Sequence, residues 1–343
     1  MSASTAVPLT PVSRIKRAAA HAAARLPRSV VRRLIRSPLN NDDEQMAPEI
    51  ALLTMAATDF STCDPARARL IVEQEAQVLA ERFPPFVVEE DLVMPGGLKA
   101  TRYRAGATSR GLLLYFHGGG FVLGSRASTE SAVRFFAVHA GVDVLSVDYR
   151  LAPEHRFPAA VEDALTAWDY VLGRAPEWGL DPHRIVVGGD SAGGNLAAVL
   201  TLQLRGRDIQ PALQVLIYPV TDMSSEHPSY VEFADQNALS AKQMRWYIDH
   251  YLSTTADAED PRASPLLADD LGGLPPAVVT VAGFDPLRDE GIAYAERLTA
   301  AGVPTRLFRE GGLVHAYIWM TAVSPAARAA TGRIAAAIAE AVR

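Results

Sequence analysis

Cysteine is nearly absent from this sequence of 343 residues, which contains only Cys63. A single thiol cannot form an internal disulfide, so a disulfide-stabilised secreted scaffold is excluded. Long apolar runs are also absent, because the longest uncharged stretch, residues 311–327, contains glycines, a histidine and a proline. The N-terminal region has no apolar core of a secretory signal, since charged residues interrupt its alanines. We therefore expect a cytoplasmic protein.

Acidic residues are missing from the first 40 positions, which carry eight Arg or Lys. The whole chain has a net charge of −6, so the remainder sums to −14. Apolar residues at helical spacing in this arm predict an amphipathic helix, with one face formed by Leu26, Val30, Val31, Leu34 and Ile35. Three alternatives stay open for the arm: packing on the protein, partial disorder, or contact with an anionic membrane surface. Binding to nucleic acid is disfavoured, because the arm lacks aromatic residues and the body is acidic.

Apolar runs alternate with helical segments along the rest of the chain. Two segments, 86–94 and 98–105, flank a Pro-Gly-Gly turn and predict a hairpin. Six more strands are expected at 111–116, 142–149, 184–189, 213–219, 277–283 and 305–310. Helices are expected within 46–82 and at 128–139, 158–173, 192–205, 287–301 and 325–342. This alternation predicts an α/β fold with a mostly parallel sheet of about eight strands, flanked by helices on both faces. An aromatic, helix-prone insertion at 222–252 interrupts it.

The segment GGDSAGGN, residues 188–195, surrounds one serine with glycines between a predicted strand and a predicted helix. Residues 189–193 fit the pattern G-x-S-x-G in the strand–turn–helix context of a nucleophile elbow. Such a sharp turn leaves no room for side chains at the two flanking glycines. Ser191 is therefore the candidate nucleophile.

The predicted strand 111–116 is followed by the sequence HGGG, residues 117–120. Glycines at the carboxyl end of a strand let backbone N–H groups approach a substrate oxygen that becomes negatively charged. The candidate oxyanion donors are Gly118, Gly119, Gly120 and Ala192. A phosphate-binding loop is the alternative, but the chain lacks the pattern G-x-x-x-x-G-K-[ST].

A serine nucleophile needs a histidine base and an acid that orients it. His315 follows the last predicted strand and completes the chain order Ser, Asp, His that is typical of this arrangement. Asp285 follows the strand 277–283 directly and is the preferred acid. Asp222, which follows the preceding strand, is the competing candidate.

The sequence resembles the hormone-sensitive lipase family of α/β-hydrolases. Five segments carry the resemblance: HGGG, DYRLAPEHRFPAAVEDA (148–164), GGDSAGGN, DPLRDEG (285–291) and the VHAY segment around His315. The resemblance implies an α/β-hydrolase fold with a helical cap and a serine carboxylesterase or lipase for short- to medium-chain esters. It implies a triad of Ser191, His315 and Asp285, no cofactor, no metal ion, a small-molecule ester as substrate and a homodimer as a plausible assembly. Ala316 departs from the glycine usual after the catalytic histidine.

This resemblance also divides the chain. Residues 46–85 and 222–255 would form the two parts of the cap, and residues 86–221 and 256–343 the two parts of the hydrolase core. Residues 1–45 would precede the usual start of the family, as a helical or partly disordered extension.

Two other classes of function remain open. The same triad and oxyanion donors serve an amidase, a deacetylase or an acyltransferase. A non-catalytic small-molecule receptor on the same fold is disfavoured, because related receptors lack the catalytic histidine and this chain has His315.

Overall fold

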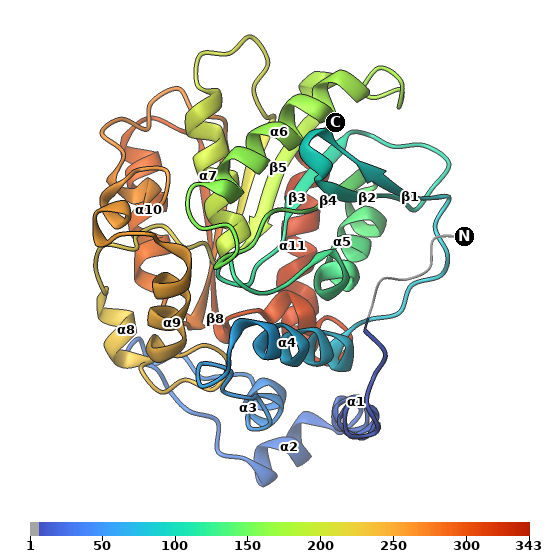
Figure 1. The fold of residues 1–343 in the computed structure, drawn as a ribbon. Helices are drawn as coiled ribbons and strands as arrows, with labels where there is room; N and C mark the ends of the chain where they lie inside the picture. Colours follow the sequence, from blue (N-terminus) through green and yellow to red (C-terminus); the bar gives the residue numbers. More distant parts are fainter. Residues whose placement is uncertain (1–6) are drawn as a thin grey trace.

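A computed structural model of the chain describes residues 7–343 (Figure 1). Within this range the strands are β1 (Val88–Val93), β2 (Lys99–Arg104), β3 (Leu112–Phe116), β4 (Asp143–Asp148), β5 (Ile185–Asp190), β6 (Leu213–Ile217), β7 (Ala277–Phe284) and β8 (Thr305–Val314). The α-helices are α1 (Pro11–Ala23), α2 (Arg28–Leu34), α3 (Pro48–Thr54), α4 (Pro65–Leu79), α5 (Arg126–Ala140), α6 (Ala159–Arg174), α7 (Ala192–Leu204), α8 (Pro228–Glu232), α9 (Ala241–Tyr251), α10 (Arg288–Ala300) and α11 (Pro325–Ala341). Short 3₁₀ helices are η1 (Pro95–Gly97), η2 (Pro182–Arg184), η3 (Thr255–Glu259), η4 (Pro265–Leu267) and η5 (Tyr317–Met320).

The strands form one sheet in the order β1-β2-β4-β3-β5-β6-β7-β8. The pairs β1/β2 and β2/β4 are antiparallel, and every later pair is parallel. The central strands β3 and β5 are buried along their whole length, as expected when helices cover both faces of a parallel sheet. The predicted α/β fold, with a mostly parallel sheet of eight strands, is confirmed.

Two hydrophobic clusters separate the layers of the molecule. One contains Trp168 of α6, Leu200 of α7 and Leu298 of α10, on one face of the sheet. The other contains Phe136 of α5 and Ile338 of α11, on the opposite face. This sandwich fixes the strands, so that the loops at their carboxyl ends are held against one another.

The last strand is longer than predicted, because β8 runs to Val314 rather than ending at residue 310. A register irregularity between Ala282 and Phe284 of β7 lets β8 pair again at Val314. The extension carries the chain to the residue directly before His315. His315, the candidate base, therefore follows an ordered strand directly and does not lie in a long free loop.

The N-terminal arm forms two helices instead of the single apolar stripe predicted over residues 26–35. Pro27 separates them, because it precedes α2 and leaves Leu26 outside both helices. Of the predicted stripe only Val31 is buried. Arg17 of α1 donates hydrogen bonds to the carbonyl oxygens of Gln77 and Ala80 and so ties the arm to α4 and the segment after it. Residues 1–6 of the predicted extension lie outside the described residues.

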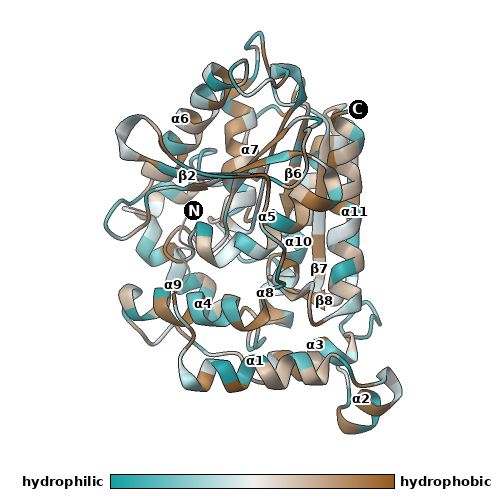
Figure 2. Ribbon diagram, turned by 90° about the vertical axis from the view of Figure 1, so that its right-hand side faces the viewer, coloured by the Kyte–Doolittle hydropathy of each residue, from teal (hydrophilic) through white to brown (hydrophobic). Residues whose placement is uncertain are grey.

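Helices α1, α2 and α3 lie at one end of the molecule, in both views (Figures 1 and 2). In Figure 2, hydrophilic and hydrophobic residues alternate along these helices. Across residues 7–343, no helix combines the length and the apolar character needed to cross a bilayer.

Candidate active site

Ser191 lies at the sharp turn between β5 and α7. Its backbone has φ 57° and ψ −118°, which is unusual for a residue with a side chain. A Cβ at Gly193 would lie 1.9 Å from the carbonyl oxygen of Phe116, and one at Gly189 would lie 2.4 Å from the same oxygen. Any side chain at these two positions would therefore collide with backbone. The glycines allow the turn, and the turn presents the serine hydroxyl.

Ser191, His315 and Asp285 lie in hydrogen-bond contact. Ser191 and His315 are 124 residues apart in the chain, and Asp285 and His315 are 30 residues apart. His315 Nε2 is 3.0 Å from Ser191 Oγ, and His315 Nδ1 is 2.7 Å from Asp285 Oδ2. All three residues are buried, and Asp285 has no exposed surface. The second carboxylate oxygen of Asp285 accepts the backbone N–H of Leu287 at 2.9 Å. The carboxylate is thus fixed from both sides, and it can hold the imidazole with Nε2 directed at the serine.

Asp222, the competing acid, makes a different set of contacts. Its oxygens accept hydrogen bonds from Ser224 and Ser225 and lie 3.0 Å from His227 Nε2. Burial opposes ionisation of Asp222, but these hydrogen bonds outweigh burial and hold its pKa below the ordinary range. The structure therefore brings Asp285 and not Asp222 to His315.

The loop after β3 supplies backbone N–H groups beside the serine. Gly119 and Gly120 have φ values of 118° and 58°, which favour glycine. Within residues 7–343 no acceptor is found for the amides of Gly119, Gly120 and Ala192. Gly118 differs, because its N–H donates to Asp190 Oδ1 at 2.9 Å. Gly118 was predicted as a fourth oxyanion donor, and this hydrogen bond revises that prediction to three.

Asp190 connects the turn at Ser191 to the loop of residues 117–120, which we call the oxyanion loop. It accepts the hydroxyl of Tyr115 at 2.6 Å in addition to the amide of Gly118. Burial raises the pKa of this carboxyl, although both hydrogen bonds oppose the rise. On the other side of the loop, the ring of His117 stacks on Tyr149, whose hydroxyl donates to the carbonyl oxygen of His117 at 2.8 Å. These buried contacts fix the loop before any substrate arrives.

A cavity of about 330 Å³ extends from His315 to the N-terminal arm, and Ser191 and Asp285 are not among its lining residues. His315 and Ala316 lie among its lining residues, together with apolar side chains of α3, α4 and η5 such as Leu53, Leu79 and Trp319. Helix α1 supplies a further wall through Lys16, Ala19, Ala20 and Ala23. The arm is therefore part of the cavity, which the sequence did not indicate, because the contact joins residues far apart in the chain.

The chain matches a family model described as alpha/beta hydrolase fold over residues 113–319. The chain belongs to the alpha/beta hydrolase family. It is 41% identical over 259 residues to a carboxylic ester hydrolase of Mycobacterium tuberculosis, which covers 72% of this chain and 69% of that protein. It is 43% identical to an ethyl acetate hydrolase of Pseudomonas putida, over 62% of this chain and 67% of the other.

Solved structures resemble this hydrolase as well. A thermostable carboxylesterase from a metagenomic library superposes with a TM-score of 0.79 at 42% identity, covering 82% of this chain and 99% of the other. An ester hydrolase from the metagenome of Lake Arreo has a TM-score of 0.78 at 34% identity and covers 97% of this chain and 99% of the other. The 3% of the chain left uncovered is too short to contain the whole 45-residue extension. The alignment with this relative therefore includes part of the extension, whereas the thermostable carboxylesterase leaves 18% of this chain uncovered.

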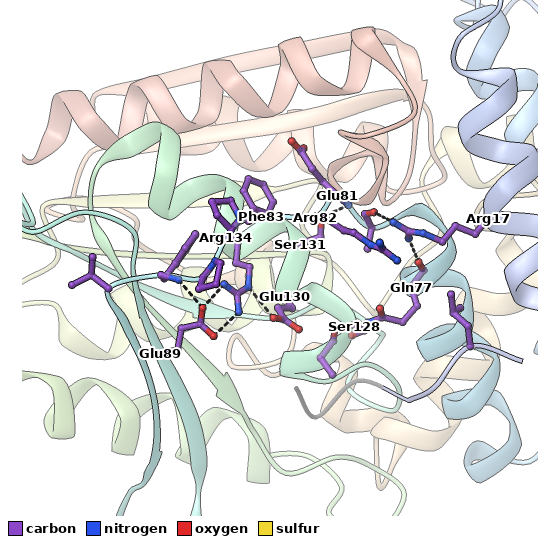
Figure 3. Close-up of a pocket in the computed structure, with 17 residues that line it drawn as sticks. Arg17, Gln77, Glu81, Arg82, Phe83, Glu89, Ser128, Glu130, Ser131 and Arg134 are labelled. Atoms are coloured by element: carbon purple, nitrogen blue, oxygen red, sulfur yellow. Dashed lines mark hydrogen bonds and ion pairs between the residues drawn. The ribbon is translucent and has the colours of Figure 1, made fainter. Parts of the chain in front are cut away.

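The hydrolase has a second, larger cavity of about 800 Å³ between α1, residues 80–87 and α5 (Figure 3). The triad residues are not among those that line it. Its charged groups largely satisfy one another, since Arg134 pairs with both Glu89 and Glu130 at 2.8 Å. No three His, Cys, Asp or Glu side chains of the described range are grouped so that they could hold a metal ion.

Glu290 of α10 is a residue near the hydrolase site that sequence reasoning missed. It is fully buried, and its Oε1 accepts the backbone N–H groups of Thr221 and Asp222 at 2.6 and 3.3 Å. It therefore anchors the loop that follows β6. Burial, with smaller contributions from the nearby Asp222 and Asp285, raises its pKa well above the ordinary value. A glutamate within the helical segment DPLRDEG gives no local sign of such burial.

We expect Glu290→Gln to stabilise the hydrolase relative to the wild type increasingly as pH rises. The raised pKa means that the folded wild type keeps a proton on Glu290 that the unfolded chain releases. The free energy of unfolding of the wild type therefore falls as pH rises above the ordinary glutamate pKa, and glutamine removes that loss. Urea unfolding between about pH 5 and pH 8 measures the difference. Glu296→Gln, at an exposed position of the same helix, is the control. If the free energy of unfolding of Glu290→Gln instead decreased relative to the wild type as pH rises, Glu290 would not have a raised pKa in the folded protein.

Proposed function

We propose that the chain is a serine carboxylesterase in which Ser191, His315 and Asp285 are the catalytic residues. The observation that carries the proposal is the continuous hydrogen-bonded line from Asp285 Oδ2 through His315 to Ser191 Oγ, at 2.7 and 3.0 Å. The relatives named as ester hydrolases, at 41 to 43% identity, support ester bonds as the bonds that are cleaved.

The reaction follows from the geometry. Ser191 Oγ attacks the ester carbonyl carbon while His315 Nε2 takes its proton. The carbonyl oxygen becomes negative and accepts hydrogen bonds from the amides of Gly119, Gly120 and Ala192. His315 then donates its proton to the departing alkoxide, and the alcohol leaves an acyl-enzyme. A water molecule activated by His315 attacks that acyl group, which releases the carboxylic acid and restores the serine hydroxyl.

The insertion after β6 lies against the oxyanion loop, which supports its assignment as part of a cap over the site. A Cβ at Gly120 would lie 2.1 Å from Cδ1 of Tyr247 on α9. Tyr251 of the same helix stacks on Phe121, with 3.8 Å between ring centroids. In this proposal α3 and α4 form the other part of the cap. Cap and loop together exclude water around the developing charge.

The proposed substrate preference follows from the cavity that reaches His315. Its volume of about 330 Å³ and its mainly apolar lining favour an acyl chain of short to medium length. Initial rates on p-nitrophenyl esters from acetyl to palmitoyl test this expectation, and we expect a maximum below the longest chains. A matching series of p-nitroanilides tests the alternative amidase activity, which would be preferred if the anilides were cleaved and the esters were not.

The homodimer and the cytoplasmic location stay predictions. A homodimer through β8 would use an edge strand whose Arg306 and Arg309 already pair with Glu340 and Asp42. The cytoplasmic location stays a prediction from the sequence.

A further inference from the structure

Exposed apolar side chains gather on the N-terminal helices. Ile15 and Val12 of α1 are 71% and 63% exposed, Leu34 of α2 is 66% exposed, and Met55 at the end of α3 is 70% exposed. Leu26 and Val30 are exposed to a lesser degree. Large apolar side chains that remain in water at one end of a protein indicate a surface that meets another phase or partner.

Cationic side chains without ion-pair partners accompany them. Among the described residues no ion pair is found for Arg14, Arg25, Arg32, Arg33 or Arg36. The first acidic residue along the chain, Asp42, is itself paired with Arg309 at 2.8 Å. We call these five arginines, with Val12, Ile15, Leu26, Val30, Leu34 and Met55, the arm surface. Within residues 7–343, the positive charge of these five arginines is therefore not neutralised by a direct ion pair.

The cavity that is lined by His315 also reaches exposed residues that neighbour Ile15 and Met55 of the arm surface. At its inner end His315 is buried, whereas Lys16, Ala19, Ala56 and Ala57 at its other end are exposed. Ala19 lies one helical turn after Ile15 on the same face of α1. Met55 directly precedes Ala56. Exposed apolar side chains thus border the mouth of the cavity, on α1 and at the end of α3.

We propose that the arm surface binds an anionic lipid bilayer, so that the mouth of the cavity faces the lipid. Helices that lie on such bilayers insert apolar side chains among the acyl chains while Arg and Lys contact the anionic headgroups. The unpaired arginines supply that complementarity, and the net charge of the remaining chain disfavours binding through another face. An apolar ester could then pass from the bilayer through the cavity to His315, whose Nε2 lies 3.0 Å from Ser191 Oγ, without crossing water. This last step rests on the proposed esterase function, whereas binding itself does not.

Flotation with vesicles tests the proposal. Full-length Ser191→Ala protein, which cannot turn over lipid, is mixed with vesicles of phosphatidylcholine alone or with phosphatidylglycerol added. We expect binding only to the anionic vesicles and weaker binding as salt increases. Arg32→Glu combined with Arg33→Glu should weaken binding by about tenfold or more. Ile15→Ser combined with Leu34→Ser should weaken it as well.

Matched controls use equally exposed positions outside the arm. Arg110→Glu reverses the charge of an exposed arginine, and Val93→Ser replaces an exposed apolar side chain. Both variants should bind vesicles as the unsubstituted arm does. In the Ser191-containing enzyme, arm variants should keep the rate on soluble p-nitrophenyl acetate and lose the rate on a long-chain ester held in anionic vesicles. Equal binding by the Arg32/Arg33 variant and the control variants would overturn the proposal. The proposal would also be overturned if light scattering showed a dimer that Ile15→Ser dissociates, because a second copy of the chain would then occupy the arm surface.

Discussion

Replacing Ser191 with alanine is expected to lower kcat on p-nitrophenyl acetate by on the order of 10⁶. The substitution removes the Ser191 hydroxyl, which lies 3.0 Å from His315 Nε2, so no acyl-enzyme can form. The oxyanion amides and the cavity remain, and they should leave a residual rate above that of water alone. Initial rates and a phosphonate-labelling assay at the serine would both report the loss.

A matched control is available in β4. Ser146 is buried like Ser191, but its hydroxyl has no hydrogen-bond partner among the described residues. Ser146→Ala therefore repeats the same chemical change in the core and should leave kcat within about twofold of the wild type. If Ser191→Ala retained wild-type turnover, the nucleophile would lie elsewhere and the proposed mechanism would be wrong.

The second large effect is expected for Asp285→Asn, which should lower kcat by about 10⁴. Asparagine fits the same space, but its amide N–H₂ can face His315 Nδ1 and favour the tautomer that carries the proton on Nε2. In that tautomer His315 cannot accept the proton of Ser191. Circular dichroism and a denaturation midpoint would show that the variant folds, which separates the loss of activity from a loss of structure.

Asp222→Asn is the control for this experiment, because Asp222 was the competing acid in the sequence. Its contacts are with Ser224, Ser225 and His227, so we expect kcat to stay within about tenfold of the wild type. A loss of about 10⁴ in Asp222→Asn, with little change in Asp285→Asn, would reverse the assignment.

Some features of the site were predictable because they are local in the chain. The elbow at Ser191 depends on glycines two residues to either side and on the strand and helix that flank them. The oxyanion loop depends on consecutive glycines after an apolar strand. Such short-range constraints leave a readable pattern, since only glycine tolerates the close backbone contacts. His315 was found through chain order and strand position.

The sequence by itself determined the α/β alternation, the position of the candidate nucleophile Ser191 and the short list of its candidate partners. The sequence already favoured Asp285 over Asp222 as the acid. Only the tertiary structure brought Asp285 into contact with His315, engaged the amide of Gly118 with Asp190, buried Glu290 and placed α1 along the cavity. Each of these four outcomes joins residues that are tens to hundreds of positions apart. Periodicity and local motifs indicate which way a side chain faces within one helix, strand or turn. Contacts between residues far apart in the chain depend instead on how the layers pack against one another, and no single segment determines that packing.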